Sequence, residues 1–176
     1  MHNFSELINR CTIFTLEALK EVEEKTIDSL QTSKETSLVK NLQMIRLEKT
    51  ILAVGIISIF EAILQDRLNC INGFSEVKNL LKQKGDLALI SQFTDLELAV
   101  NALKHGRGRS YNTLVTKDGR SSPSNVKQPD EHFFDEGDVS EITTLIDVDD
   151  TFLYSCVEII RQVSESIMKI RPEVAL

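Results

Sequence analysis

The chain of 176 residues carries 27 acidic and 20 basic side chains, so its formal net charge is −7. Its length suits one domain with a sizeable core, and a composition of 41% hydrophobic and 27% charged residues is ordinary for a globular protein. The negative balance argues against general coating of nucleic acid, although it allows a local basic site. We therefore expect a single domain over residues 1–176.

Nothing in the sequence predicts a membrane segment or a metal centre. The amino terminus lacks a basic and then apolar leader. The most apolar run, 51–64, is too short to span a bilayer and contains Glu61. Cys11, Cys70 and Cys156 are far apart, and each lies in an apolar helical pattern typical of reduced core cysteines. We expect a cytoplasmic protein without metal or cofactor.

Helical periodicity predicts a first helix from Phe4 to about Leu30. Its expected core face consists of Phe4, Leu7, Ile8, Cys11, Phe14 and Ala18. A second helical pattern runs from about Glu35 to Asn69, which unbroken would be roughly 50 Å long. We therefore expect this helix either to kink or to overhang the core, and Gly55 is a candidate for a kink or a close helix contact.

Glu61 is a carboxylate inside the apolar middle of the second helical pattern. An unpaired buried carboxylate is costly, so the side chain should face a partner or a cleft, or else reach water at the edge of the core. After an Asn72-Gly73 turn, Ser75 is expected to cap a short helix that Gly85 ends.

The stretch 94–112, TDLELAVNALKHGRGRSYN, predicts a helix that runs into a basic loop. Thr94 and Glu97 have the spacing of a capping box, and Gly106 stands where a helix commonly ends. The buried stripe is expected to consist of Leu96, Val100 and Leu103.

Polar groups collect at the end of this helix. Glu97, Asn101 and His105 are four residues apart and share one face, while Arg107 and Arg109 follow at once. The helix dipole favours the protonated form of an imidazole in the last turn. A histidine that closes a helix beside solvated arginines, with no further role, is the alternative interpretation.

Helical periodicity fails after Tyr111, where a basic segment is followed by an acidic one. Residues 130–150 contain nine acids and no Lys or Arg. The β-branched run 141–148 predicts a strand, and residues 114–116 are its expected partner, so we predict a small β-hairpin or strap over about 112–148. Asp149 or Asp150 should cap a last helix from Thr151 to about Ile170. Its expected core face consists of Phe152, Leu153, Cys156, Ile159, Ile160, Val163 and Ile167.

These apolar stripes can bury one another only by packing together, which predicts an all-α, antiparallel bundle of four to five helices with a small insertion before the last. The run V-N-A-L-K-H-G resembles the motif of the HEPN families, which are small helical-bundle domains. Many of them carry R-x-x-x-x-H, with a polar residue after the Arg and a Gly after the His. Asn101, His105 and Gly106 match this pattern, and Val100 stands at the Arg position.

The resemblance implies an RNA-directed protein, such as a metal-independent ribonuclease acting as a toxin or defence factor. His105 would be the acid and base, and Asn101 would orient it or bind phosphate. Because Val100 replaces the motif arginine, Lys104, Arg107 and Arg109 would have to supply the phosphate-binding cations.

The resemblance also implies a homodimer that places two motif helices around one cleft. Glu97 and Glu61 would support the site, and Tyr111 would stack on a base. A second hypothesis is a non-catalytic bundle that binds a nucleotide or a protein partner, with the acidic 130–150 segment as a docking or masking element. A third hypothesis is a purely scaffolding helical protein.

Overall fold

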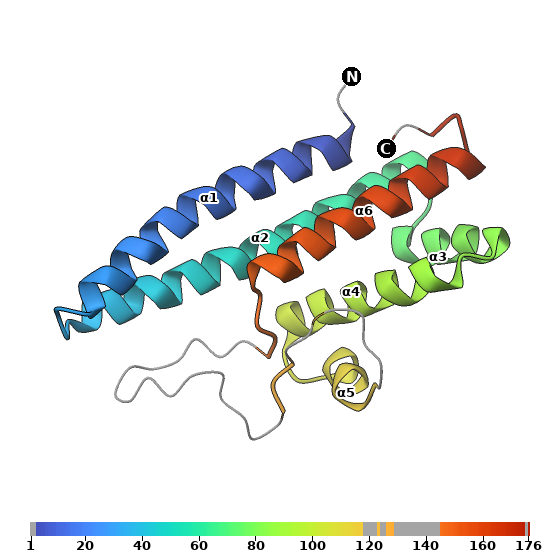
Figure 1. Ribbon diagram of the computed structural model, residues 1–176. Coiled ribbons are helices and arrows are strands. Elements are labelled where there is room, and N and C mark those ends of the chain that lie inside the picture. Colours follow the sequence, from blue (N-terminus) through green and yellow to red (C-terminus); the bar gives the residue numbers. More distant parts are fainter. Residues whose placement is uncertain (1–2, 118–122, 124–125, 129–144, 175) are drawn as a thin grey trace.

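A computed structural model of the chain describes residues 3–117, 123, 126–128, 145–174 and 176. Helices dominate this part of the chain, as Figure 1 shows, and the all-α prediction is confirmed. Their bounds are α1 (Phe4–Leu30), α2 (Thr36–Leu68), α3 (Gly73–Lys84), α4 (Leu87–His105), α5 (Arg109–Thr116) and α6 (Asp150–Ile170). None of the described helices is long and apolar enough to cross a membrane.

The long helices α1 and α2 form an antiparallel hairpin, and α6 packs against both. Helix α2 continues through Gly55 without a break. The turn end of the hairpin projects beyond α4 and α6 (Figure 1), so of the two expectations for this helix the overhang is the one observed.

Lys49 fastens the overhanging hairpin to α6. Its Nζ lies 3.5 Å from Glu23 Oε2 on α1 and 2.8 Å from Asp150 Oδ1 on α6. Burial lowers the pKa of the Lys49 amine, but the neighbouring Asp150 and Glu23 carboxylates raise it by more, so the net shift is upward. The amine is therefore held in its charged form between three helices.

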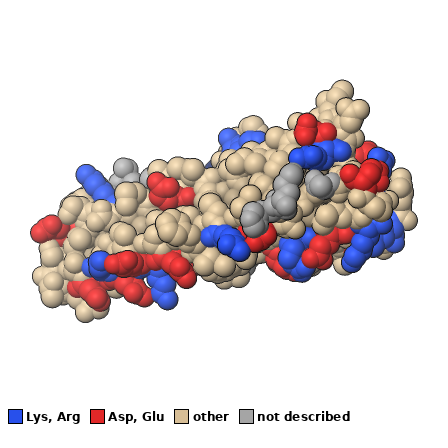
Figure 2. All heavy atoms as spheres, turned by 90° about the horizontal axis from the view of Figure 1, so that it is seen from above, with Lys and Arg blue, Asp and Glu red and all other residues tan. Residues whose placement is uncertain are grey.

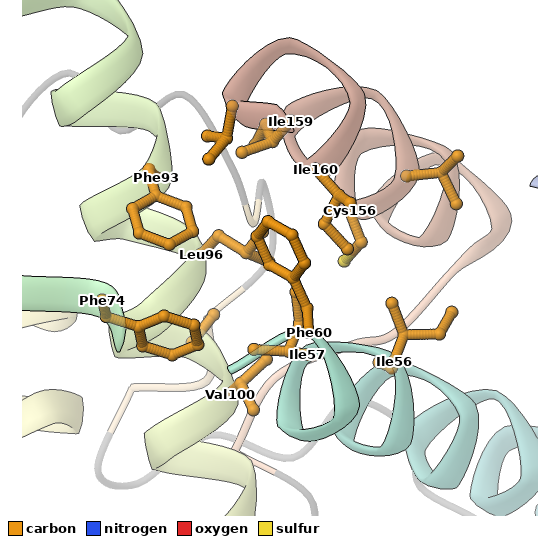
Figure 3. Packing of buried hydrophobic residues seen from close by; sticks show 14 of the residues in the cluster. Ile56, Ile57, Phe60, Phe74, Phe93, Leu96, Val100, Cys156, Ile159 and Ile160 are labelled. Carbon is orange, nitrogen blue, oxygen red and sulfur yellow. The ribbon is translucent and has the colours of Figure 1, made fainter. Parts of the chain in front are cut away.

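The core lies where α2, α3, α4 and α6 meet, and aromatic rings mark its centre. The Phe60 ring points from α2 toward α4 and α6 (Figure 3) and is fully buried. It stacks on Phe4 of α1 at 5.9 Å and meets Phe93 of α4 edge-on at 6.5 Å. Phe93 in turn meets Phe74 of α3 edge-on at 5.1 Å. One connected set of rings thus joins α1, α2, α3 and α4.

The close contact between helices is at Gly73 rather than at Gly55. A Cβ added to Gly73 would lie 2.8 Å from Leu64 Cβ and 3.0 Å from the Glu61 carbonyl oxygen of α2. A Cβ added to Gly55 would meet nothing within 4 Å, so the expectation of a close approach there is wrong.

We expect Gly73→Ala to lower the free energy of unfolding by about 1–3 kcal/mol, because α3 must move off α2 to accept the methyl group. Gly55→Ala should raise it by up to about 1 kcal/mol, because alanine is the better helix former and has room. Urea unfolding followed by circular dichroism measures both. Equal stability of Gly73→Ala and the wild type would show that the α2–α3 contact yields easily.

The predicted core face of α1 is wrong for several of its members. Ile8 and Leu16 are buried, whereas Leu7 is 53% exposed, Phe14 is 74% exposed and Cys11 is exposed. The physical reason is that α1 lies at the edge of the molecule, against α2 and α6 only, so one side of it is covered. Cys11 is therefore not a core cysteine.

The other two cysteines fit the expectation better. Cys156 is buried and Cys70 is half-buried, and both are free thiols. Burial raises the pKa of both thiols, which keeps them protonated and unreactive near neutral pH.

The last helix follows the sequence prediction closely. The Asp149 carboxylate accepts a hydrogen bond of 2.7 Å from the Phe152 amide, which makes Asp149 the cap. All seven residues of the predicted core face are buried. The regular spacing of these residues on a helix with an otherwise polar surface explains the success.

The predicted hairpin lies mostly outside the described residues. Val126 and Ile146 form an antiparallel bridge, and the Lys127 amide donates to the Leu145 carbonyl at 2.9 Å. Residues 129–144, including most of the acidic segment, are not described. The strand predicted at 114–116 is wrong, because these residues belong to α5, where Tyr111 and Leu114 bury one helical face.

Candidate functional site

Helix α4, which carries the candidate site, begins earlier than predicted. Asp86 is its cap, since its carboxylate accepts a 3.3 Å hydrogen bond from the Leu89 amide. Thr94 lies inside the helix and its hydroxyl donates to the Ile90 carbonyl at 2.7 Å, so the predicted capping box is wrong. The reason is that buried Leu89 and Phe93 continue the apolar face toward the amino terminus.

The α4–α5 junction is a tight reversal between two helix ends. Helix α4 ends at His105, and Gly106 has a φ of 71° while its amide donates to the Ala102 carbonyl at 2.9 Å. Glycine accepts this φ without strain. Gly108 precedes α5, and no side chain caps the first turn of α5. The first amides of α5 therefore remain available to a ligand, and they lie at the positive end of the helix dipole, beside Arg109.

Four basic side chains gather at this junction: Lys104, His105, Arg107 and Arg109, and all of them are exposed. No acidic residue occurs between Leu98 and Thr116 in the sequence. Guanidinium groups and an uncapped helix start both favour an anion, and phosphate is the anion that they fit best. The junction is thus a local basic site on an acidic protein.

Asn101 and Glu97 behave differently from each other. Asn101 is half-buried one turn before His105, close enough along the helix to share a ligand with it. Glu97 lies about 12 Å from His105 along the helix axis. Its carboxylate pairs with Lys78 Nζ of α3 at 2.7 Å, so it fastens α4 to α3 and does not reach the imidazole.

Val100, at the position of the motif arginine, belongs to the core. It is 2% exposed, and its side chain lies among the core residues that Figure 3 labels. Its direction differs from that of His105 by about 140° around the helix. A long cationic side chain at this position would point into the core, so the cations of the site come from the junction that follows α4.

Tyr111 does not serve as a base-stacking platform, which corrects the sequence interpretation. Its ring is 2% exposed, and its hydroxyl donates a 2.7 Å hydrogen bond to the Lys127 carbonyl. The residue instead holds the segment after α5 against the body of the protein. Because this contact is made with a residue distant in sequence, periodicity alone gives no sign of it.

Glu61 lies half-buried on α2, close to the start of α3. Within the described part of the chain, its carboxylate makes no hydrogen bond or ion pair. Its role at the site stays a prediction.

An ion pair below the junction was not predicted from the sequence. The Asp95 side chain on α4 is 0% exposed and pairs with Lys117, which follows α5. The pair joins α4 to the far end of α5 and so fixes the direction in which α5 leaves the junction. The sequence contained one sign of this ion pair: Asp95 is a carboxylate on the side of α4 that is otherwise apolar.

A groove of about 370 Å³ between the start of α1 and α6 is a weaker candidate. Arg161 lines it but is paired with Glu158 and Glu165. Hydrogen bonds from Arg161 and Gln162 lower the pKa of Glu158 to about 2, so the charges there already satisfy one another. In the described part of the chain, no group of three His, Cys, Asp or Glu side chains is arranged to hold a metal ion.

Comparisons of the chain with protein-family models, with curated proteins and with solved structures gave no match.

Proposed function

We propose that this chain is a HEPN-like, RNA-directed protein whose α4–α5 junction binds a phosphate of RNA beside His105. The observation that supports the proposal best is the exposed imidazole at the end of α4, followed by two exposed guanidinium groups at the start of α5. In this proposal, the helices form an antiparallel bundle with an insertion between α5 and α6. Under the same proposal, the protein acts in the cytoplasm, as a toxin or defence factor like those that the HEPN resemblance implies.

The chemistry follows from the residue types. Arg107, Arg109 and Lys104 hold the phosphate, and the amides that start α5 add donors. His105 takes a proton from the ribose 2′-hydroxyl or gives one to the leaving oxygen, because imidazole exchanges protons near neutral pH. Asn101, one turn earlier, orients the imidazole or the phosphate. His105 performs one of the two proton transfers that the cleavage requires, and a water molecule accepts or supplies the other proton.

A second candidate is a non-catalytic protein that binds RNA or a nucleotide at the same junction. The burial of Val100 favours it, since the motif arginine is missing and its position faces the core. Guanidinium groups that follow the helix are less rigidly placed than one on the helix, and catalysis depends on fixed donors.

The two candidates are separated by incubating the purified protein with a mixed RNA pool in EDTA. We expect metal-independent cleavage that falls about 10²- to 10⁴-fold in His105→Ala. Arg107→Ala with Arg109→Ala should weaken RNA binding. Lys169→Ala, which removes one positive charge from the last turn of α6, is the matched control and should match the wild type in both assays.

Each outcome supports or contradicts one role of the junction. RNA binding without cleavage by the wild type, weakened by the double arginine variant, establishes the non-catalytic candidate. Cleavage that His105→Ala leaves unchanged contradicts the catalytic role. RNA affinity unaffected by loss of both arginines contradicts the phosphate site itself. Circular dichroism of each variant verifies that the helices remain folded.

A further inference from the structure

The outer side of α1 exposes large apolar side chains. Leu7, Phe14 and Val22 recur at helical spacing and are 53%, 74% and 39% exposed. Cys11 lies between the first two on the same side and is exposed as well. A stripe of this kind on a helix normally packs against another apolar surface.

Helix α2 exposes a matching stripe. Met44, Ile51 and Ile59 are 47%, 55% and 55% exposed. Gly55 lies on the same side, one turn after Ile51, and the space above it is open. We call the three large residues of each stripe, together with Cys11 and Gly55, the hairpin face.

The hairpin register brings the two stripes level with each other. Phe4 stacks on Phe60, and the antiparallel course from there places Phe14 near the level of Ile51. On α1, Asn9 lines the groove against α6, and on α2, Phe60 is buried in the core. The stripes lie on the remaining sides of the two helices, away from α4 and α6. Seen from above, uncharged surface occupies much of the middle of the molecule, with charged side chains along its edges and at its ends (Figure 2).

The exposed area of the hairpin face is that of a protein interface. At roughly 200 Å² for a fully exposed large apolar residue, its six large residues leave on the order of 650 Å² in contact with water. The largest apolar patch of a typical monomer is about 300–600 Å². A stable protein interface buries about 800 Å² on each partner. The hairpin face thus exceeds the first value and approaches the second before its rim is counted.

We propose that a second copy of this chain covers the hairpin face, so that two α1–α2 hairpins pack across a two-fold axis into a four-helix layer. A two-fold interface requires a surface that is complementary to itself. A largely apolar face meets this requirement, and it carries one charge of each sign: Glu48 lies between Met44 and Ile51 on the α2 stripe, and Arg10 lies beside Leu7 and Phe14 on α1. Gly55, without a side chain, lets a partner helix approach closely.

This arrangement differs from a dimer built around two motif helices. In Figure 1 the α4–α5 junction lies on the side of the molecule away from α1. Pairing through the hairpin face therefore leaves the two junctions at opposite ends of the dimer, each with its own ligand. The inference does not rest on the proposed function.

Sedimentation equilibrium of the full chain at about 1–100 µM tests the proposal, because interfaces of this size have micromolar or tighter affinities. We expect a mass of twice 19.9 kDa for the wild type. Phe14→Glu with Ile51→Glu should weaken association at least about 100-fold, because charges would be buried without partners. Tyr154→Glu is the matched control: Tyr154 is 46% exposed on α6, outside the face, and its variant should stay dimeric.

A second readout uses Cys11, the exposed cysteine. Its alkylation by iodoacetamide should slow as the protein concentration rises, and it should be independent of concentration in the double glutamate variant.

Gly55→Arg, which has room in the single chain, should also produce monomers if the glutamate variants misfold. A wild type that is still monomeric at the highest of these concentrations overturns the proposal and leaves the face to another protein. Unchanged mass in both sets of variants overturns it as well. RNA binding, measured separately, responds to the junction arginines and not to these variants.

Discussion

Replacing Phe60 with alanine should lower the free energy of unfolding by about 3–5 kcal/mol, the usual cost of removing a buried phenyl ring. Phe60 is 0% exposed and contacts rings from α1 and α4. The lost ring leaves a cavity bounded by several helices, and their backbones prevent it from closing completely.

The matched control is Leu87→Ala, which truncates a side chain that is 69% exposed at the start of α4. It should change stability by less than about 0.5 kcal/mol. Guanidinium unfolding of both variants, followed by circular dichroism, gives the comparison. A cost below about 1 kcal/mol for Phe60→Ala would mean that the rings rearrange to fill the space.

The same substitution affects the candidate site, because Phe60 meets Phe93 of α4 edge-on at 6.5 Å. Helix α4 carries Asn101 and His105 on its outer side while its inner side rests on the core. Looser packing between α2 and α4 should therefore reduce RNA binding or cleavage at temperatures well below the unfolding midpoint. Helix α4 thus couples the packing of the core to the position of His105.

Sequence patterns predicted the helices more reliably than the faces that they bury. The bounds of α1 and the buried face of α6 agree with expectation. On α1, two neighbouring stripes are both apolar, one through Ile8 and the other through Leu7 and Phe14, and periodicity cannot choose between them. The choice depends on where α2 and α6 lie, which is a property of the tertiary structure.

The candidate site shows the same division. The end of α4 at His105 follows from a local signal, Gly106, whereas the helix that begins at Arg109 was expected to be a loop. The burial of Tyr111 and the pairing of Asp95 with Lys117 depend on how α5 folds back on α4, and no local pattern predicts this. Thr94 was wrongly predicted to be a cap because the spacing of Thr94 and Glu97 is that of a capping box, and this spacing also occurs inside helices.

The pair between Asp95 and Lys117 leads to a second large expected effect. Lys117→Met should lower the free energy of unfolding by about 2–4 kcal/mol, because it removes a cation that pairs with the buried Asp95 carboxylate. Asp95→Asn should cost only about 1 kcal/mol. The asymmetry arises because the Lys117 side chain is 29% exposed and can turn into water, whereas the Asp95 side chain is 0% exposed and cannot.

A double-mutant cycle with Lys117→Met, Asp95→Asn and the combined variant isolates the coupling. The combined variant should be more stable than the sum of the single effects predicts, by at least about 1 kcal/mol. Strict additivity would show that the two side chains act independently. Because Lys117 follows the last turn of α5, its loss should also speed hydrogen exchange of the α5 amides while those of α6 keep their protection. If α5 presents Arg109 to phosphate, RNA affinity in Lys117→Met should then fall even though every proposed ligand-binding residue is still present, which separates the placement of the arginines from their charge.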